Sequence, residues 1–160
     1  LIACMTSCAP WSTYPPVESK LAQKMTRETF EPVPTVMVVA LNYAREHYAG
    51  GREVAINLPE GSSSQVYDKV IKKLGWGRPM VDSMEETLHV TEVRTRGFTG
   101  QVDLISRRTD GLNQMVTIFI AGGAVEHYKV NGTRVWQMRN LQSPAPNYVP
   151  PPVAEEKPAK

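Results

Sequence analysis

The chain has 160 residues, 41% of them hydrophobic and 21% charged, and a formal net charge of +2 at pH 7. This length suits one domain with a sizeable core and is short for two ordinary domains. The weak positive charge does not indicate nucleic acid, which calls for a clustered basic face, and the longest apolar run, Val36 to Leu41, is far shorter than a bilayer-spanning helix.

The N-terminal residues Leu1-Ile2-Ala3-Cys4 resemble the lipobox of bacterial lipoproteins, the short motif at which a leader is cleaved. The resemblance implies that Cys4 becomes the first mature residue and carries acyl chains. The polar, proline-containing stretch from Thr6 to Pro16 is typical of a tether. We therefore expect an exported protein that is lipid-anchored to the cell envelope through Cys4. The alternative is a coincidental tetrapeptide at a chain end.

The prolines divide the chain into three parts, because most of them lie before Thr35 or after Ser143. We predict a lipobox-like start and flexible linker at residues 1–34, with at most one marginal turn or helix between Val17 and Phe30. A single α+β domain is predicted at residues 35–140. Residues 141–160 have the composition of a proline-rich disordered tail, which extends as polyproline II where it is ordered.

Two amphipathic helices are predicted at the start of the domain. The first begins near Thr35, carries a wide apolar stripe and ends at Ala49-Gly50-Gly51. A short strand, Arg52–Leu58, follows it. The second helix, Ser63–Leu74, is predicted to begin at a capping box formed by Ser62 and Gln65 and to stop at Gly75.

An antiparallel meander is predicted from Leu88 onward. Asn131-Gly132 accepts positive φ and fits a tight hairpin, which would place Lys129 opposite Arg134 and His127 opposite Trp136. The fold class is therefore α+β: helix, strand and helix, then an antiparallel β-meander, with the helices packed on one face of the sheet. The predicted strands are Leu88–Thr95, Gln101–Arg107, Met115–Ala121, Val125–Val130 and Thr133–Met138.

No catalytic, metal-binding or cofactor-binding constellation is predicted. The serines after Gly61 lack the second glycine of a nucleophile elbow. The three histidines show no spacing that is typical of a metal site, and the acids Asp82, Glu85 and Glu86 are interpreted as a solvated loop.

Cationic residues of the meander form the one candidate site. Arg94 and Arg96 alternate on one strand, and they are grouped with Arg107, Lys129 and Arg134 as a candidate surface for an anionic partner: an acidic protein, a phosphate-rich lipid or a polysaccharide. The alternative is an ordinary charged sheet face, in which Glu92, Asp103 and Glu126 alternate with the cations.

These observations favour a non-enzymatic cell-envelope lipoprotein domain that acts as a binding or structural subunit of a larger assembly. Its expected partners are the membrane, through the lipid anchor, and a protein. The first alternative is a winged-helix-like nucleic-acid-binding domain, although nucleic acid is disfavoured for an exported chain. The second alternative is a small ligand-binding or hydrolytic α+β domain, since such folds support many activities.

Overall fold

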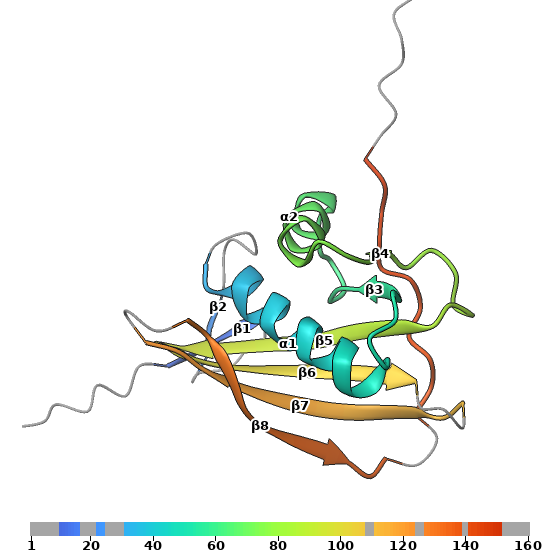
Figure 1. Ribbon diagram of the computed structural model, residues 1–160. Helices are drawn as coiled ribbons and strands as arrows, with labels where there is room; N and C mark the ends of the chain where they lie inside the picture. Colours follow the sequence, from blue (N-terminus) through green and yellow to red (C-terminus); the bar gives the residue numbers. More distant parts are fainter. Residues whose placement is uncertain are drawn as a thin grey trace, which may run out of the picture.

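The computed structural model describes residues 10–16, 22–24, 31–107, 111–123, 127–138 and 141–151 (Figure 1). The described helices and the mostly antiparallel sheet confirm the α+β class. Cys4 and the rest of the lipobox-like start lie outside the described residues. The elements are β1 (Trp11–Tyr14), β2 (Ala22–Lys24), α1 (Val33–Tyr48), β3 (Ala55–Asn57), α2 (Ser64–Leu74), β4 (Arg78–Pro79), β5 (Thr87–Arg96), β6 (Thr99–Arg107), β7 (Asn113–Ala121) and β8 (Lys129–Trp136).

The sheet has the strand order β2-β1-β5-β6-β7-β8. Strands β5 to β8 form an antiparallel meander, β1 runs antiparallel to β5, and β3 runs parallel to both β4 and β5. Side chains alternate between the two faces of a strand. On β6, Val102 and Leu104 join the core beneath α1, so Gln101 and Asp103 face the other way. We call the face turned away from α1 the open face.

Helix α1 forms because its apolar residues recur at helical spacing, and it covers β5 to β8. Gly100 on β6 lets the helix approach closely, since a Cβ built there would lie 2.7 Å from Val36 Cγ1. The buried residues of α1 are Val33, Pro34, Val36, Met37, Ala40, Leu41 and Ala44.

Helix α2 packs against α1 and ends at Gly75 as predicted. Gly75 has a φ of 72°, and its N–H donates to Ile71 O. The predicted capping box is wrong. The helix begins at Ser64, and the Ser62 hydroxyl donates to Pro59 O and lies 2.5 Å from the Tyr14 hydroxyl. Ser62 is buried, and the Pro59 carbonyl and the distant Tyr14 hydroxyl engage its side chain in place of the helix N-terminus.

Strands β1 and β2 belong to the stretch that was predicted to be a flexible linker. They precede α1, so the predicted order of helix, strand, helix and meander is incomplete. The linker prediction rested on proline content, but edge strands tolerate neighbouring prolines. Tyr14, at 4% exposure, joins the core and fixes β1 in the sheet.

The predicted hairpin at Asn131-Gly132 is wrong, because one continuous strand, β8, runs through both residues. Gly132 pairs with Phe119 and Val130 pairs with Ile120, which leaves Asn131 as the extra residue of a bulge. Lys129 and Arg134 therefore lie on the same strand. The exposed His127 precedes this strand, so it does not face Trp136. Continuous pairing with the long strand β7 outweighs the turn preference of an Asn-Gly dipeptide.

Residues 141–151 contain no helix or strand, but they are held against the domain. Asn113 Nδ2 donates to Leu141 O at 2.9 Å, and Asn57 Nδ2 donates to Ala145 O at 2.7 Å. The expected disordered tail is thus an ordered, extended segment up to Pro151, drawn in orange to red in Figure 1. Neither described helix combines the length and the apolar character needed to cross a bilayer.

Candidate functional site

All five cations of the predicted anionic-partner surface fall on the open face. Directly paired residues of an antiparallel sheet share a face. One row of paired residues runs from Arg96 on β5 through Thr99 and Ala121 to Lys129 on β8. A second row runs from Asp103 on β6 through Thr117 to Arg134 on β8. Arg94 pairs with Gln101, and Arg107 lies an even number of residues from Gln101 on β6, so both also point to the open face. Adjacent strands lie about 4.8 Å apart, so the surface extends roughly 14 Å from β5 to β8.

Arg94, at the centre of this surface, is neutralised by two carboxylates. Its Nη2 lies 2.8 Å from Asp103 Oδ2, and its Nη1 lies 3.2 Å from Glu92 Oε2. Asp103 is only 6% exposed, so the pair with Arg94 is largely shielded from solvent. The charge of Arg94 is therefore compensated within the chain, as the alternative of an ordinary charged sheet face expects for this position.

A hydrogen-bond chain extends from Asp103 to the edge strand. The Thr117 hydroxyl donates to Asp103 Oδ1 at 2.5 Å and accepts from Trp136 Nε1 at 2.8 Å. Arg94, Asp103, Thr117 and Trp136 thus connect β5, β6, β7 and β8 across the open face. This chain orients the indole of Trp136, which is 43% exposed.

Two arginines of the surface lie over indole rings. The Arg134 guanidinium carbon is 5.2 Å from the centroid of Trp136, and that of Arg96 is 4.8 Å from the centroid of Trp11. Within the described part of the chain, no hydrogen bond or ion pair engages either guanidinium. Stacking restricts the rotamers of an arginine and leaves its N–H donors available to an anion. The open face therefore carries two oriented guanidinium groups, one near each side.

The remaining two cations are exposed. Arg107 donates through Nε to Gly111 O at 3.3 Å, and Lys129 lies on β8 in the row of Arg96. They add positive charge at opposite ends of the meander strands.

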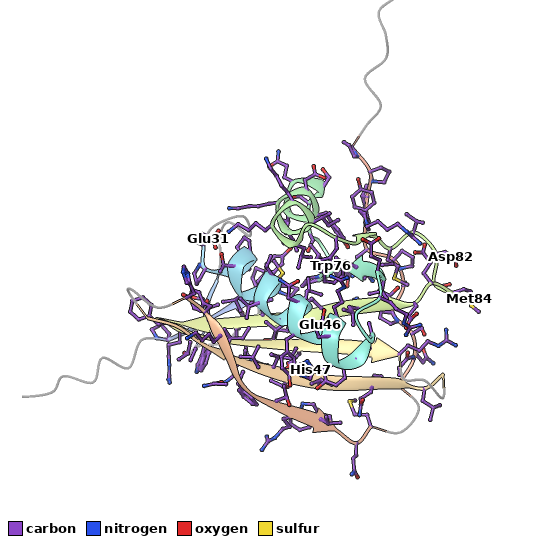
Figure 2. All side chains as sticks on the ribbon, viewed as in Figure 1. Glu31, Glu46, His47, Trp76, Asp82 and Met84 are labelled. Atoms are coloured by element: carbon purple, nitrogen blue, oxygen red, sulfur yellow. The ribbon has the colours of Figure 1, made fainter. Side chains whose placement is uncertain are left out.

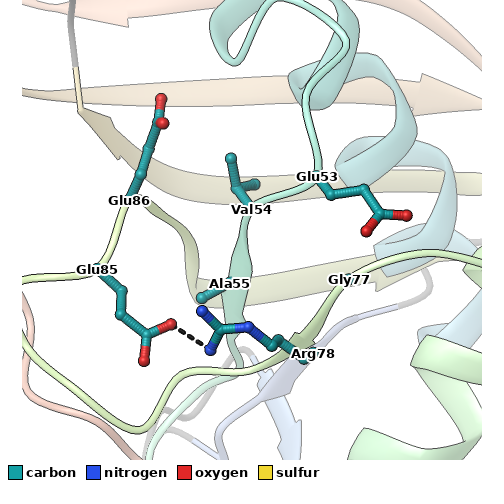
Figure 3. A pocket seen from close by; sticks show the side chains of 7 residues that line it. All are labelled: Glu53, Val54, Ala55, Gly77, Arg78, Glu85 and Glu86. Atoms are coloured by element: carbon teal, nitrogen blue, oxygen red, sulfur yellow. Dashed lines mark ion pairs between the residues drawn. The ribbon is translucent and has the colours of Figure 1, made fainter.

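A pocket of about 310 Å³ lies where β3, β4 and β5 begin (Figure 3). Its wall includes Glu53, Arg78, Glu85 and Glu86. Arg78 forms an ion pair with Glu85, whose Oε2 accepts no well-aligned hydrogen bond, and Arg52 lies 2.5 Å from Glu86. Most of the charge in the wall is therefore already compensated from within the chain.

The acids that were predicted to occupy a solvated loop are only partly solvated. Asp82 and Met84 lie at the tip of the loop before β5 (Figure 2), and both are exposed. Glu85 instead holds the loop together, since its Oε1 accepts from Asp82 N at 3.1 Å while its other oxygen pairs with Arg78. Glu85 and Glu86 thus shape the loop through ion pairs.

Beneath the C-terminal segment lies a cavity of about 20 Å³, room for one water molecule. His89 lines it together with Glu85, Arg107 and Ser143. Burial lowers the pKa of His89 to about 4, and its Nδ1 has no hydrogen-bond partner in the part of the chain that the structure describes. His89 is thus neutral near pH 7.

The other two histidines have surroundings unlike those of metal ligands. His47 stacks on Tyr43 with 3.9 Å between ring centroids, and His127 is exposed. Across the described ranges, no three His, Cys, Asp or Glu side chains gather closely enough to hold a metal ion.

The sequence reasoning missed the residues that organise the open face. Trp136 follows Arg134 by two positions, and this strand spacing already places the two on one face. Trp11 was hidden in a stretch interpreted as linker. Thr117 and Asp103 give no local signal, because their bond depends on the cross-strand register. Comparisons with protein-family models, characterised proteins and solved structures give no match for this chain.

Proposed function

We propose that this chain is a non-enzymatic cell-envelope lipoprotein domain, tethered through Cys4, that binds an acidic surface of a partner protein. The observation that carries the binding part is the pair of Arg-on-Trp arrangements on the open face, Arg96 over Trp11 and Arg134 over Trp136. The proposal takes both helices to lie on the opposite side of the sheet. The C-terminal segment covers the end of the open face near His89 and Arg107, so the partner is proposed to bind the part that carries Arg96 and Arg134.

A protein partner fits the chemistry of this face. Trp and Arg are the residues that most often dominate binding energy in protein interfaces. A guanidinium binds a carboxylate through two parallel hydrogen bonds, which gives both strength and orientation. Arg94 contributes little to this, because Glu92 and Asp103 already compensate its charge. Binding therefore depends on the outer arginines.

The test measures binding of poly-L-glutamate, a protein-like polyanion, by isothermal titration calorimetry at low and high salt. Arg134→Gln and Arg96→Gln are each expected to weaken binding roughly tenfold, since one lost charge-assisted contact is worth about 1.4 kcal/mol. Lys72→Gln removes the same charge from the exposed side of α2 and is the matched control. Equal losses in all three variants would show that only net charge matters and would refute the site.

Two further polyanions separate the partner classes. Dextran sulfate and single-stranded oligothymidylate are titrated under the same conditions. Preference for poly-L-glutamate supports a protein partner. Tighter binding of dextran sulfate would point to a polysaccharide, and tighter binding of the oligonucleotide would favour nucleic acid, and either result would overturn the proposed partner class.

The tether is tested separately, by intact mass of the natively expressed chain and sequencing of its N-terminal peptide. A mature chain that starts at Cys4 and is heavier by acyl groups is the expected result. An N-terminus without lipid would remove the envelope anchor and leave the binding proposal to be judged by the titrations alone.

A further inference from the structure

The side chain of Asn57, at the end of β3, recognises the main chain of the C-terminal segment. Its Nδ2 donates to Ala145 O at 2.7 Å, and its Oδ1 accepts from Asn147 N at 2.9 Å. Asn57 has 0% exposure, so both bonds are shielded from water. One amide side chain thus pairs with an extended peptide much as a neighbouring strand would.

Side chains of the C-terminal segment also contact the domain. Asn147 Nδ2 donates to Leu58 O at 2.9 Å, and Tyr148 lies edge-on against Tyr67 with 5.0 Å between ring centroids. The Tyr67 hydroxyl accepts from Leu58 N at 2.9 Å and donates to Asn57 Oδ1 at 3.1 Å. The polar groups of this network satisfy one another across the junction between domain and segment.

We infer that Asn57, Leu58 and Tyr67 form a peptide-binding groove, whose ligand is an extended peptide with the sequence Ala-Pro-Asn-Tyr. In this structure the chain's own residues 145–148 fill the groove in cis. A separate peptide of the same sequence exchanges with them. This site is independent of the open face, because it is built at the end of β3 and on α2.

Three properties of the contacts make the groove a recognition site for a short peptide. Among the described residues, the contacts between the groove and the segment fall on the four consecutive residues from Ala145 to Tyr148. The main-chain bonds require an extended backbone, which Pro144 and Pro146 favour before binding. The side chains of Asn147 and Tyr148 then supply selectivity. The cis segment competes at an effective concentration that is roughly millimolar for short connections, so an added peptide meets a filled groove.

The test uses the full chain with Asn147→Ala and Tyr148→Ala, which leaves the groove intact but weakens its own ligand. A synthetic peptide of residues 143–149, Ser-Pro-Ala-Pro-Asn-Tyr-Val, is titrated by fluorescence anisotropy. We expect saturable binding that is at least about tenfold tighter than to the unmodified chain. Adding Asn57→Ala to the variant, or replacing Asn and Tyr in the peptide by Ala, is expected to abolish it. A folded variant without saturable binding would overturn the inference.

Hydrogen exchange of the unmodified chain gives an answer even where that variant fails to fold. The amide of Asn147 is bonded to Asn57 Oδ1, so its exchange reports undocking of the segment. If a separate peptide can replace the segment, the segment must undock without global unfolding. The amide hydrogen of Asn147 is then expected to exchange with solvent faster than the core amides of β6. Exchange of Asn147 only on global unfolding would show that the segment is a fixed part of the fold, and the inference would fail.

Discussion

Lowering the pH from 7 to 5 is expected to destabilise the fold through His89. Its side chain is buried between the sheet and the C-terminal segment, and burial lowers its pKa to about 4 from the ordinary value of 6.5. The charged groups that line the same cavity are Glu85 and Arg107, and Glu85 is paired with Arg78. Nδ1 of His89 has no partner among the described residues that would stabilise a proton.

Proton linkage gives the direction in which the free energy of unfolding changes with pH. The folded state binds the proton more weakly than the unfolded state, so the contribution to stability is complete above pH 6.5 and is lost as the pH falls toward 4. With pKa values of 6.5 unfolded and about 4 folded, the loss at pH 5 is about 2 kcal/mol and its limiting value at lower pH is about 3 kcal/mol. Such a loss is a large fraction of the stability of a small domain.

Urea denaturation of the wild type and of His89→Phe at pH 7 and pH 5 measures the effect. Phenylalanine keeps the ring and cannot take up a proton, so the variant is expected to lose about 2 kcal/mol less than the wild type between these pH values. His47→Gln, on the exposed side of α1, is the control and is expected to keep the wild-type loss. Equal losses in the wild type and His89→Phe would refute the reasoning.

Three substitutions test the packing and pairing of the sheet that carries the open face. Gly100→Ala places a Cβ 2.7 Å from Val36 Cγ1 and is expected to cost about 1–3 kcal/mol through overpacking, measured as a lower melting temperature. Gly132→Val is expected to change stability by less than about 1 kcal/mol, because Gly132 pairs inside β8 and valine suits a strand; a large loss would favour a tight turn there. Asp103→Asn leaves Arg94 with Glu92 alone and is expected to cost about 2 kcal/mol by urea denaturation, whereas an unchanged value would show that the pair with Arg94 contributes nothing.

Local patterns in the sequence were sufficient for the helices and for most of the meander. The apolar spacing from Val36 to Ala44 predicts the buried face of α1, and Gly75 predicts the end of α2, because both signals act within one or two turns. Strands β5, β6 and β7 were predicted within a few residues of their observed bounds. In these regions, local preference and tertiary packing agree.

The errors arose where a distant partner overrules a local preference. Asn131-Gly132 favours a hairpin by itself, but pairing with β7 extends β8 through it. Ser62 has the form of a helix cap, yet its hydroxyl bonds to Pro59 and Tyr14. The buried amide of Asn57 selects the C-terminal segment from 88 residues away, and no window of the sequence contains both partners.

The candidate site was predictable only in part, because its arrangement depends on contacts between strands that are distant in sequence. Alternation within one strand places Arg94 and Arg96 on one face, and only the register between strands adds Arg107, Lys129 and Arg134 to it. Whether a cation is free depends on cross-strand neighbours. Asp103 lies beside Arg94 only because Glu92 pairs with Asp103 after the bulge at Val90. The sequence therefore predicted which residues share the face and missed which of them are neutralised.

The neutral centre of the open face determines the shape of ligand that suits it. Asp103, Thr117 and the compensated Arg94 occupy the middle and leave the oriented guanidinium groups of Arg96 and Arg134 on either side. A single small anion would meet only one of them, at the modest strength of an exposed pair. Arg96 and Arg134 are separated by about 14 Å across the strands and, because they lie four residues apart in register, by about 13 Å along them. A partner with two carboxylates roughly 20 Å apart would therefore engage both. Linking the two contacts in one rigid partner raises affinity beyond either alone, which is why the proposed partner is an ordered acidic protein surface and not a free anion.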